Sequence, residues 1–238
     1  MSDWAKLWPP MAANFLTYAE KTGAVLVTCS NLYGYGPVDV PMTESLPLDA
    51  TGVNGKVRAN MWIEAKAMHD AGIIKATEVR GSDYVSASNQ SRVGARVIPK
   101  VLAGKPAQVL GAIDLKHTWT YPLDVARLMK IVASDSRAWG KAWHVPSNEA
   151  KTQHEVVSEL ASEAGVSNPK LSSVPNVIWN LIALFNPLMR ALKETAYQMQ
   201  RPYILDDSAA RETFGMQPTP WNQILNDVVA EMKASLKK

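Results

Sequence analysis

A short apolar run that stops at small polar residues constrains the fold of this chain more than any other feature. Residues 24–27 read Ala-Val-Leu-Val, follow Gly23, and lead into Thr-Cys-Ser-Asn-Leu-Tyr-Gly-Tyr-Gly at 28–36. A valine-rich run between a glycine and a polar turn is typical of a strand buried on both faces of a parallel sheet. We therefore predict a strand at 24–28 in the middle of such a sheet.

The carboxyl end of a central parallel strand opens onto the crevice where open α/β sheets bind their ligands. The four residues that would stand at this mouth are Cys29, Ser30, Asn31 and Tyr33.

Helical and strand patterns alternate along the first half of the chain. Residues 10–22 follow two prolines and end before Gly23, and residues 55–71 have an apolar face and end before Gly72. A second buried strand is predicted at 73–79. This alternation with short connections predicts a parallel sheet with helices on its faces. Further helices are expected at 92–103, 123–134, 152–165, 175–197, 207–214 and 221–235, and further strands at 107–110 and 143–145.

Composition excludes several classes of protein. The 238 residues are 47% hydrophobic and 20% charged, which is ordinary for a globular protein. The net charge of +3 is spread evenly, which argues against a nucleic-acid partner. The single cysteine excludes an internal disulfide and fits a reducing compartment, and the four histidines lack metal-ligand spacing. With no secretion signal and no bilayer-spanning run, we predict a soluble cytoplasmic protein without metal or membrane partner.

The chain lacks the usual start of a dinucleotide-binding sheet. Such a sheet opens with a strand that runs into a glycine-rich turn and a helix. Here Gly34-Tyr-Gly36 is followed by Pro37 instead of a helix, and the third glycine is missing. We interpret this segment as a plain turn, so we expect the chain to be the second half of such a fold or a version of the fold that lost the first half.

Four segments resemble those of a known family in their order and spacing. They are Thr-Cys-Ser-Asn-Leu-Tyr-Gly at 28–34, Pro-Met-Thr-Glu-Ser-Leu-Pro at 41–47, Val-Arg-Gly-Ser-Asp-Tyr at 79–84, and Thr-Trp-Thr-Tyr-Pro-Leu-Asp-Val-Ala at 118–126. Together they resemble the extended short-chain dehydrogenases/reductases, the NAD-dependent epimerases/dehydratases. No single segment is specific, but the series covers nearly the whole chain.

This resemblance implies an α/β fold, a partial Rossmann-like parallel sheet flanked by helices, with a small, mostly helical C-terminal substrate domain. The NAD(P)-binding part would span 1–150, with substrate-domain segments interleaved from about 86–120, and the substrate domain would span 151–238. The resemblance also implies NAD or NADP as cofactor and a glycine-rich fingerprint upstream of Met1.

Redox members of the family use a Ser or Thr, a Tyr, and a Lys four residues after the Tyr. Aligning Gly55 with the family glycine places Asn54 at the Tyr position and Arg58 at the Lys position, and the Ser position falls on Cys29. Asn54 cannot exchange a proton near neutral pH, whereas Arg58 stays charged and can bind ribose or phosphate. This pattern resembles an atypical branch of the family.

Other groups could replace the missing proton donor. Tyr33 or Tyr35 could do so if its side chain points into the crevice; the alternative is that Tyr33 packs in the turn and Tyr35 lies on the surface. Cys29 would be a nucleophile only beside an activating neighbour, and a lone cysteine at a strand end is more often a small buried hydrophobe.

The resemblance implies site residues at the next strand end and in a later loop. Arg80 could contact the cofactor or form a structural ion pair with Asp124 or Glu78. His117 could contact substrate or lie in a solvated loop. The full set is Cys29, Ser30, Asn54, Arg58 and Tyr33 for catalysis, Thr28, Arg58, Arg80 and Asp83 for the cofactor, and Asn31, Tyr33, Tyr84 and His117 for the substrate.

The predicted function is that of an NAD(P)-dependent epimerase/dehydratase-like oxidoreductase acting on a sugar or another hydroxyl or carbonyl compound. The alternatives are a non-catalytic NAD(P)-binding sensor and a half-fold that binds no nucleotide. In the family, the helices at 10–22 and 55–71 pair with their copies in a homodimer, and Trp62 would suit that contact. Burial under the chain's own sheet is the other interpretation.

Overall fold

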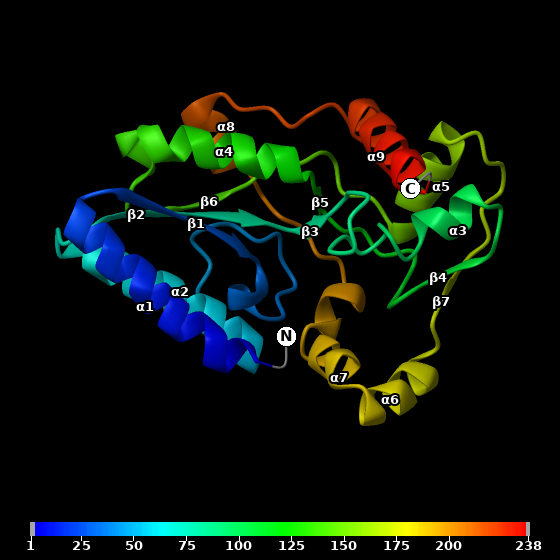
Figure 1. Ribbon diagram of the computed structural model, residues 1–238, viewed down its shortest axis with the longest axis horizontal. Helices are drawn as coiled ribbons and strands as arrows, with labels where there is room; N and C mark the ends of the chain where they lie inside the picture. The colour runs from blue at the N-terminus through cyan, green and yellow to red at the C-terminus, as the bar shows by residue number, and fades with distance from the viewer. Residues whose placement is uncertain (1–2, 237–238) are drawn as a thin grey trace.

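A computed structural model describes residues 3–236, apart from the side chains of Asn176, Pro187 and Leu188. Figure 1 shows two regions side by side: a sheet covered by long helices, and a smaller region around α3, α5 and α9. Helices α6 and α7 lie below the junction between them. None of the helices within residues 3–236 is long and apolar enough to cross a membrane.

The main sheet consists of β1 (Val25–Asn31), β2 (Lys75–Gly81) and β6 (Ala142–His144), all parallel and in the order β1-β2-β6. The predicted parallel sheet is therefore confirmed, but the predicted place of residues 24–28 in its middle is wrong. Within the described chain, β1 is an edge strand and mostly half-buried, whereas β2 is central and buried from Ala76 onward. The central strand is the more polar one because its buried charges, Glu78 and Arg80, pair with each other.

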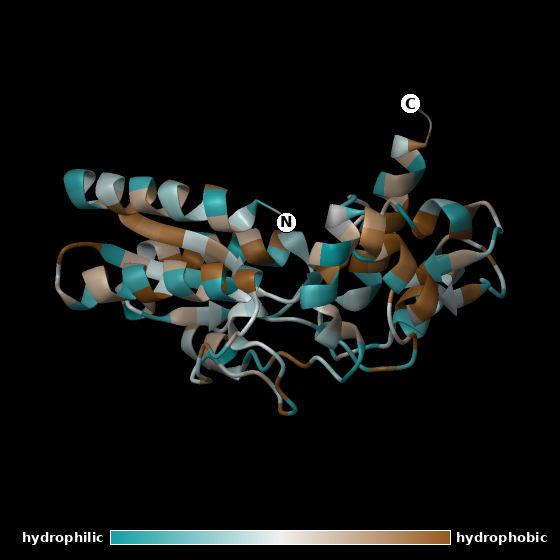
Figure 2. Cartoon of the chain, turned by 90° about the horizontal axis from the view of Figure 1, so that it is seen from below, coloured by the Kyte–Doolittle hydropathy of each residue, from teal (hydrophilic) through white to brown (hydrophobic). Residues whose placement is uncertain are grey.

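Helices cover both faces of this sheet. Helices α1 (Trp4–Thr22) and α2 (Val53–Asp70) lie against one face, and α4 (Pro122–Ser134) and α8 (Ser208–Phe214) lie against the other (Figure 1). The first pair buries a core that includes Leu16 and Trp62, and the second pair buries Leu128 and Trp143. Trp62 thus packs inside its own subunit. In Figure 2, polar and apolar residues alternate along the turns of the helices. This is the pattern expected of helices that pack one face on a sheet and expose the other.

Helix α1 begins earlier than predicted, and it contains Pro9 and Pro10 where a start was expected. The extra turns carry Trp4 and Trp8, whose rings pack on the guanidinium of Arg58 at 4.8 and 4.1 Å from its central carbon. These cation–π contacts stabilise the part of α1 that precedes the two prolines. The end of α1 matches the prediction, since Gly23 adopts the left-handed conformation that terminates a helix.

The smaller region has its own core. Helices α3 (Ile98–Leu102), α5 (Gln153–Glu163) and α9 (Trp221–Ser235) bury a cluster that includes Val156, Leu160 and Val228. Helix α9 has the predicted bounds, and α5 begins with the predicted capping box of Thr152 and Glu155. Helix α3 is shorter than the predicted 92–103. Strand β4 (Ala107–Val109) pairs in parallel with β7 (Leu171–Ser173), which was not predicted.

Short elements connect the two regions. Strand β3 (Asp83–Tyr84) continues the chain from β2 and pairs with β5 (Trp119–Thr120). The helix expected over 175–197 is broken into α6 (Asn176–Phe185), α7 (Pro187–Glu194) and the 3-10 turn η3 (Ala196–Met199). The break coincides with Pro187, which cannot continue a helix because it has no N–H to donate. A further 3-10 turn, η1 (Tyr33–Tyr35), follows β1.

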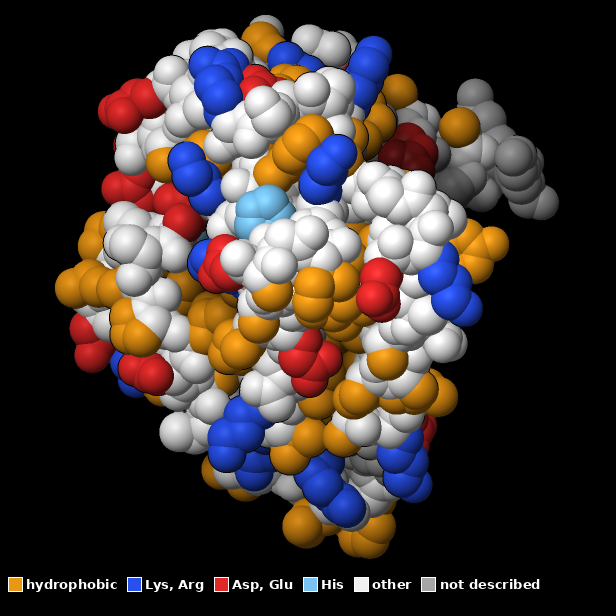
Figure 3. Space-filling model, turned by 90° about the vertical axis from the view of Figure 1, so that its left-hand side faces the viewer, with side chains coloured by type: hydrophobic (Ala, Val, Ile, Leu, Met, Phe, Trp, Pro, Cys, Tyr) orange, Lys and Arg blue, Asp and Glu red, His pale blue; other side chains and the backbone are white. Residues whose placement is uncertain are grey.

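Acidic and basic side chains are intermingled with exposed apolar ones on the face at the α1–α2 end of the molecule (Figure 3). That face carries no uniform basic surface of the kind that binds nucleic acid.

Candidate functional site

A cavity of about 280 Å³ lies at the carboxyl ends of β1 and β2. Its walls come from the start of α1, the end of β1, the turn η1, helix α2, the β2–β3 connection and two positions near η3. Parallel strands present their carboxyl ends at the same edge, which is why residues distant in sequence meet here.

Most of the predicted site residues line this cavity. They are Cys29, Ser30, Asn31, Tyr33, Arg58, Asp83 and Tyr84. Four predicted site residues do not line it: Thr28, Asn54, Arg80 and His117. Thr28 and Arg80 belong to one buried network, and Asn54 and His117 each lie elsewhere, as described below.

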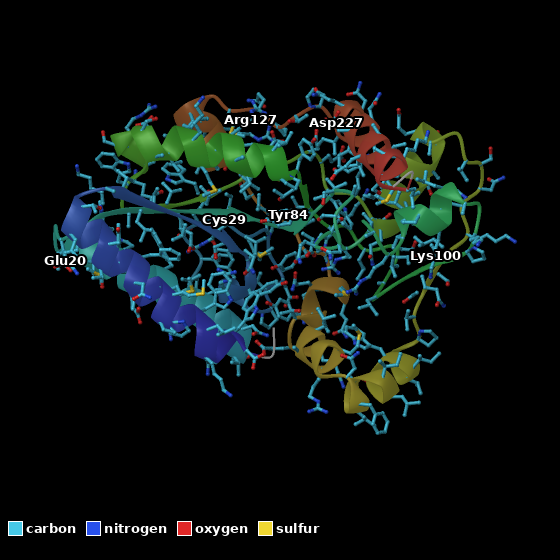
Figure 4. All side chains as sticks on the ribbon, viewed as in Figure 1. Glu20, Cys29, Tyr84, Lys100, Arg127 and Asp227 are labelled. Carbon is cyan, nitrogen blue, oxygen red and sulfur yellow. The ribbon has the colours of Figure 1, made fainter. Side chains whose placement is uncertain are left out.

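Cys29 and Tyr84 meet at the cavity wall. The Cys29 Sγ lies 3.8 Å from the Tyr84 hydroxyl (Figure 4). Cys29 is exposed, so the expectation of a small buried hydrophobe is wrong. Burial raises the pKa of Tyr84, and the neighbouring Cys29 raises it further. Tyr84 is therefore protonated at neutral pH and can donate a hydrogen bond.

Arg58 brings a positive charge to the cavity. Its guanidinium is held between Trp4 and Trp8, and burial lowers its pKa. Arginine nevertheless stays charged in proteins. No acidic side chain within residues 3–236 forms an ion pair with Arg58, and its buried Nε has no hydrogen-bond partner there. This cation is available to a ligand.

Asn54, expected at the catalytic tyrosine position, is buried away from the cavity. Its backbone N–H donates to Glu194 Oε1 at 2.5 Å, and its side-chain amide donates to Oε2 at 3.3 Å. A carboxylate is favourable at a helix N-terminus, where free N–H groups carry partial positive charge. Asn54 therefore anchors α7 to the start of α2. It does not line the cavity, where the sequence placed it as a catalytic residue.

Arg80 and Thr28 belong to a buried network behind the cavity. Arg80 Nε donates to Glu78 Oε1 at 2.7 Å, and one terminal nitrogen donates to the Tyr35 hydroxyl at 2.6 Å. The Thr28 hydroxyl donates to the other oxygen of Glu78 at 3.3 Å. Of the alternatives considered for Arg80, the ion pair with Glu78 is the one observed. Tyr35 is buried, and burial raises its pKa to about 12.

His117 is neither solvated nor part of the cavity wall. It is buried, its ring stacks on Tyr203 at 5.1 Å between centroids, and its Nε2 lies 2.8 Å from Asp83 Oδ2. Arg92 forms an ion pair with the same carboxylate. Burial alone would raise the pKa of Asp83, but Arg92 and His117 hold it well below its usual value. Burial lowers the pKa of His117, so its ring is neutral near pH 7.

Several cavity residues were not predicted from the sequence. Ser82 precedes Asp83 at the end of the second strand, and the strand-end argument that selected Asp83 could have found it. Trp4 and Tyr203 carried no such signal, because they approach from distant parts of the chain. No cluster of three or more His, Cys, Asp or Glu side chains that could hold a metal ion occurs among the residues that the structure describes.

Comparison with known proteins supplies independent information. The model of the NAD dependent epimerase/dehydratase family matches residues 10–145. No curated protein sequence matches the chain.

Several solved structures share the fold. UDP-glucose 4-epimerase from Thermotoga maritima, with UDP-glucose, is 17% identical at a TM-score of 0.77, over 98% of this chain and 71% of that one. RMD from Pseudomonas aeruginosa, complexed with NADPH, is 15% identical at a TM-score of 0.75. The match covers 97% of this chain and 74% of that one. dTDP-glucose 4,6-dehydratase from Bacillus anthracis, in complex with NAD, is 17% identical at a TM-score of 0.70. The match covers 94% of this chain and 66% of that one. The chain thus spans about two thirds of that dehydratase, and the likeness confirms the predicted Rossmann-like α/β fold.

The buried His144 predicts a pH dependence of stability. The Tyr35 hydroxyl donates to His144 Nε2 at 2.7 Å, and His144 Nδ1 donates to the Asp206 carbonyl oxygen at 2.7 Å. Burial, with a smaller contribution from the nearby Arg80, lowers the pKa of His144 to about 4. An unfolded histidine titrates near 6.5. Between these pH values the unfolded chain binds a proton that the folded chain does not, so stability falls as pH falls from 6.5 to 4.

Substituting His144→Gln should remove this contribution and flatten the pH dependence by up to about 3 kcal/mol between pH 7 and 4. Urea unfolding at pH 7, 5.5 and 4 measures it. Other titratable groups face His144, including Glu44, whose Oε1 lies 4.0 Å from His144 Nδ1. The wild-type protein and the variant share these groups, so the difference between their two pH profiles reports on His144. His154→Gln, at an exposed position, is the matched control and should keep the wild-type slope. An unchanged slope in His144→Gln would contradict the prediction.

Proposed function

The chain belongs to the NAD dependent epimerase/dehydratase family, and from that premise we propose that it is an NAD(P)-dependent oxidoreductase of epimerase/dehydratase type. Its substrate is a sugar or another small molecule with a hydroxyl or carbonyl group. The observation that carries this proposal is the cavity at the strand ends, which brings together the unpaired cation of Arg58, the hydroxyl of Ser30 and the protonated phenol of Tyr84. NAD and NADPH are bound in two of the similar structures.

The cavity fits one end of such a cofactor. Its volume is near the lower limit for small-molecule sites, and Arg58 and Asn31 offer donors for a ribose. Within residues 3–236, no glycine-rich turn leads from a strand into a helix at this cavity; Gly34 and Gly36 flank the buried Tyr35, and Gly36 packs on Ala50. The proposal therefore assigns the nicotinamide riboside end to this cavity and gives no described residue to the diphosphate. When bound, the nicotinamide accepts or delivers a hydride.

The chain's own residues take the remaining roles. Tyr84 donates the proton to the substrate oxygen, a role that Asn54 cannot fill. Cys29 orients the phenol through its contact with the Tyr84 hydroxyl, and Ser30 holds the substrate oxygen. Tyr33 is a wall residue in this proposal, because its ring stacks on Trp4 at 6.2 Å between centroids.

Binding of the cofactor tests this assignment. Titration with NAD+, NADH, NADP+ and NADPH should quench tryptophan fluorescence, since Trp4 lines the cavity. Arg58→Ala should weaken binding about tenfold or more, the effect of losing a charged hydrogen-bond donor. Arg137→Ala, which removes an exposed arginine, should change nothing. If none of the four nucleotides binds the wild-type protein, the proposed function is wrong.

One observation favours a second function, that of a non-catalytic NAD(P) sensor. The residue at the catalytic tyrosine position is an asparagine whose amide is engaged by Glu194. Turnover separates the two functions. If Tyr84 is the proton donor, Tyr84→Phe should lower kcat at least a hundredfold, the size of a general acid–base effect, and leave cofactor affinity unchanged. Cofactor binding without oxidation or reduction of any compound in a panel of sugars, sugar nucleotides and hydroxy acids would favour the sensor.

Homodimerisation through α1 and α2 is a further part of the proposal. Helix α1 exposes four large apolar side chains on one stripe, and they are Leu7, Met11, Phe15 and Tyr18. Apolar stripes of this kind are buried against a partner in stable proteins. Trp62 is excluded from the contact because it is buried in its own core.

A charge placed on this stripe should prevent the dimer. Light scattering after size exclusion should give a dimer for the wild-type protein and a monomer for Phe15→Glu. Phe185→Glu, at an exposed apolar position on α6, is the matched control and should remain a dimer. A wild-type monomer would refute this part of the proposal.

A further inference from the structure

Helix α6 presents an apolar surface to the outside of the molecule. It lies at the lower edge of the molecule in Figure 1. Among its described side chains only Trp179 and Ala183 are buried, and they pack with Ala196 and Met199. The large apolar side chains that stay exposed, called the α6 apolar face below, are Val177, Ile178, Leu181, Ile182, Leu184 and Phe185. An exposed apolar surface of this kind marks a contact with a protein or a membrane.

The helix also lacks the charged residues that an exposed helix normally carries. The sequence has no Asp, Glu, Lys or Arg from Leu171 to Met189. A helix that is apolar all round belongs in a protein core or in a membrane. Helix α6 is not in the core, since Phe185 is 84% exposed. Its composition therefore indicates a partner that removes the α6 apolar face from water.

Helix α7, which follows directly, adds positive charge beside this face. Arg190 donates to two carbonyl oxygens at the end of α6, at 2.7 and 3.3 Å, and Lys193 lies one turn further along α7. Both side chains are exposed. The one acidic residue between 170 and 200 is Glu194, whose carboxylate is directed to the start of α2. The surface beside the α6 apolar face is therefore basic.

The length of α6 limits how it can meet a membrane. Its 10 residues measure about 15 Å, half of the roughly 30 Å hydrocarbon core of a bilayer. A helix of this size can lie in the membrane plane, at the boundary between headgroups and acyl chains. The expectation of no membrane partner rested on the lack of a bilayer-spanning run, and an interfacial helix does not need one.

A second copy of the chain fits this surface less well than a membrane does. A symmetric contact brings the same patch from both subunits together. Arg190 and Lys193 would then meet an equally basic surface, and like charges across an interface are unfavourable. Anionic lipid headgroups instead attract each basic residue near the membrane surface. Charge complementarity therefore favours the membrane.

We propose that the α6 apolar face binds the surface of a membrane that contains anionic lipids. Helix α6 lies in the plane of the membrane, and Arg190 and Lys193 contact lipid phosphates. This inference goes beyond the proposed function and does not depend on it, because no described residue of α6 lines the cavity at the strand ends.

Flotation of the full chain with lipid vesicles on a density gradient tests the proposal. The wild-type protein should float with vesicles of equal parts phosphatidylcholine and phosphatidylglycerol. Phe185→Glu and Leu181→Glu should each weaken this binding about tenfold or more, because each removes a large apolar side chain from the membrane contact. Lys193→Gln should weaken it about fivefold, which corresponds to about 1 kcal/mol for one basic residue. Vesicles of phosphatidylcholine alone should bind the wild-type protein about fivefold more weakly or less tightly still, since they lack anionic headgroups.

Two substitutions on α4 are matched controls. Leu123 is 58% exposed and Leu181 is 59% exposed, and α4 lies on the opposite side of the molecule from α6 in Figure 1. Leu123→Glu and Lys130→Gln should float like the wild-type protein. They introduce the same changes of charge at exposed positions outside the proposed contact.

Several outcomes would overturn the proposal. A wild-type protein that does not float with the anionic vesicles would do so, and so would Glu variants of α6 that float like the wild-type protein. Equal binding to vesicles with and without phosphatidylglycerol would reject the role of the basic residues. If Phe185→Glu converts a dimer to a monomer in light scattering, the face belongs to a second copy and the membrane is rejected. The NAD(P) titration tests the proposed function separately.

Discussion

The buried ion pair between Glu78 and Arg80 is the interaction on which the rest of this fold depends. Both side chains lie inside the central strand β2, where an unpaired charge would be strongly destabilising. The pair also connects the neighbouring elements. Glu78 receives the Thr28 hydroxyl from β1, and Arg80 donates to Tyr35 in the turn after it. Through Tyr35 the network reaches His144 on β6, so it spans all three strands.

This network determines where the cavity lies, although none of its side chains lines the cavity wall. By holding the turn η1 against the sheet, it directs Tyr33 toward the cavity and keeps Tyr35 buried behind it. Beyond Arg80 the chain leaves the sheet, and Ser82 and Asp83 enter the wall. The charged residues beside the cavity thus differ in their contacts: Glu78 pairs with Arg80 and Asp83 with Arg92, whereas Arg58 forms no ion pair with any acidic side chain within residues 3–236.

The cavity differs from the family pattern in a consistent way. The dyad positions hold Asn54 and Arg58; the first is used to anchor α7, and the second keeps the positive charge. A phenol is still present, but it comes from Tyr84, at the end of the neighbouring strand. The proposed function uses this phenol, because catalysis depends on where groups meet in space rather than on their order in the chain.

The sequence by itself determined the local structure. Helix α9, the capping box of α5, the parallel strands and half of the cavity wall follow from periodicity, end signals and the strand-end rule, which depend on neighbouring residues. Tertiary structure decided what depends on distant partners. It made the polar β2 the central strand, because Glu78 and Arg80 neutralise each other; it turned Asn54 toward Glu194; and it brought Trp4 and Tyr203 to one cavity. No local pattern contains those pairings, since the residues that form them meet only after the chain has folded.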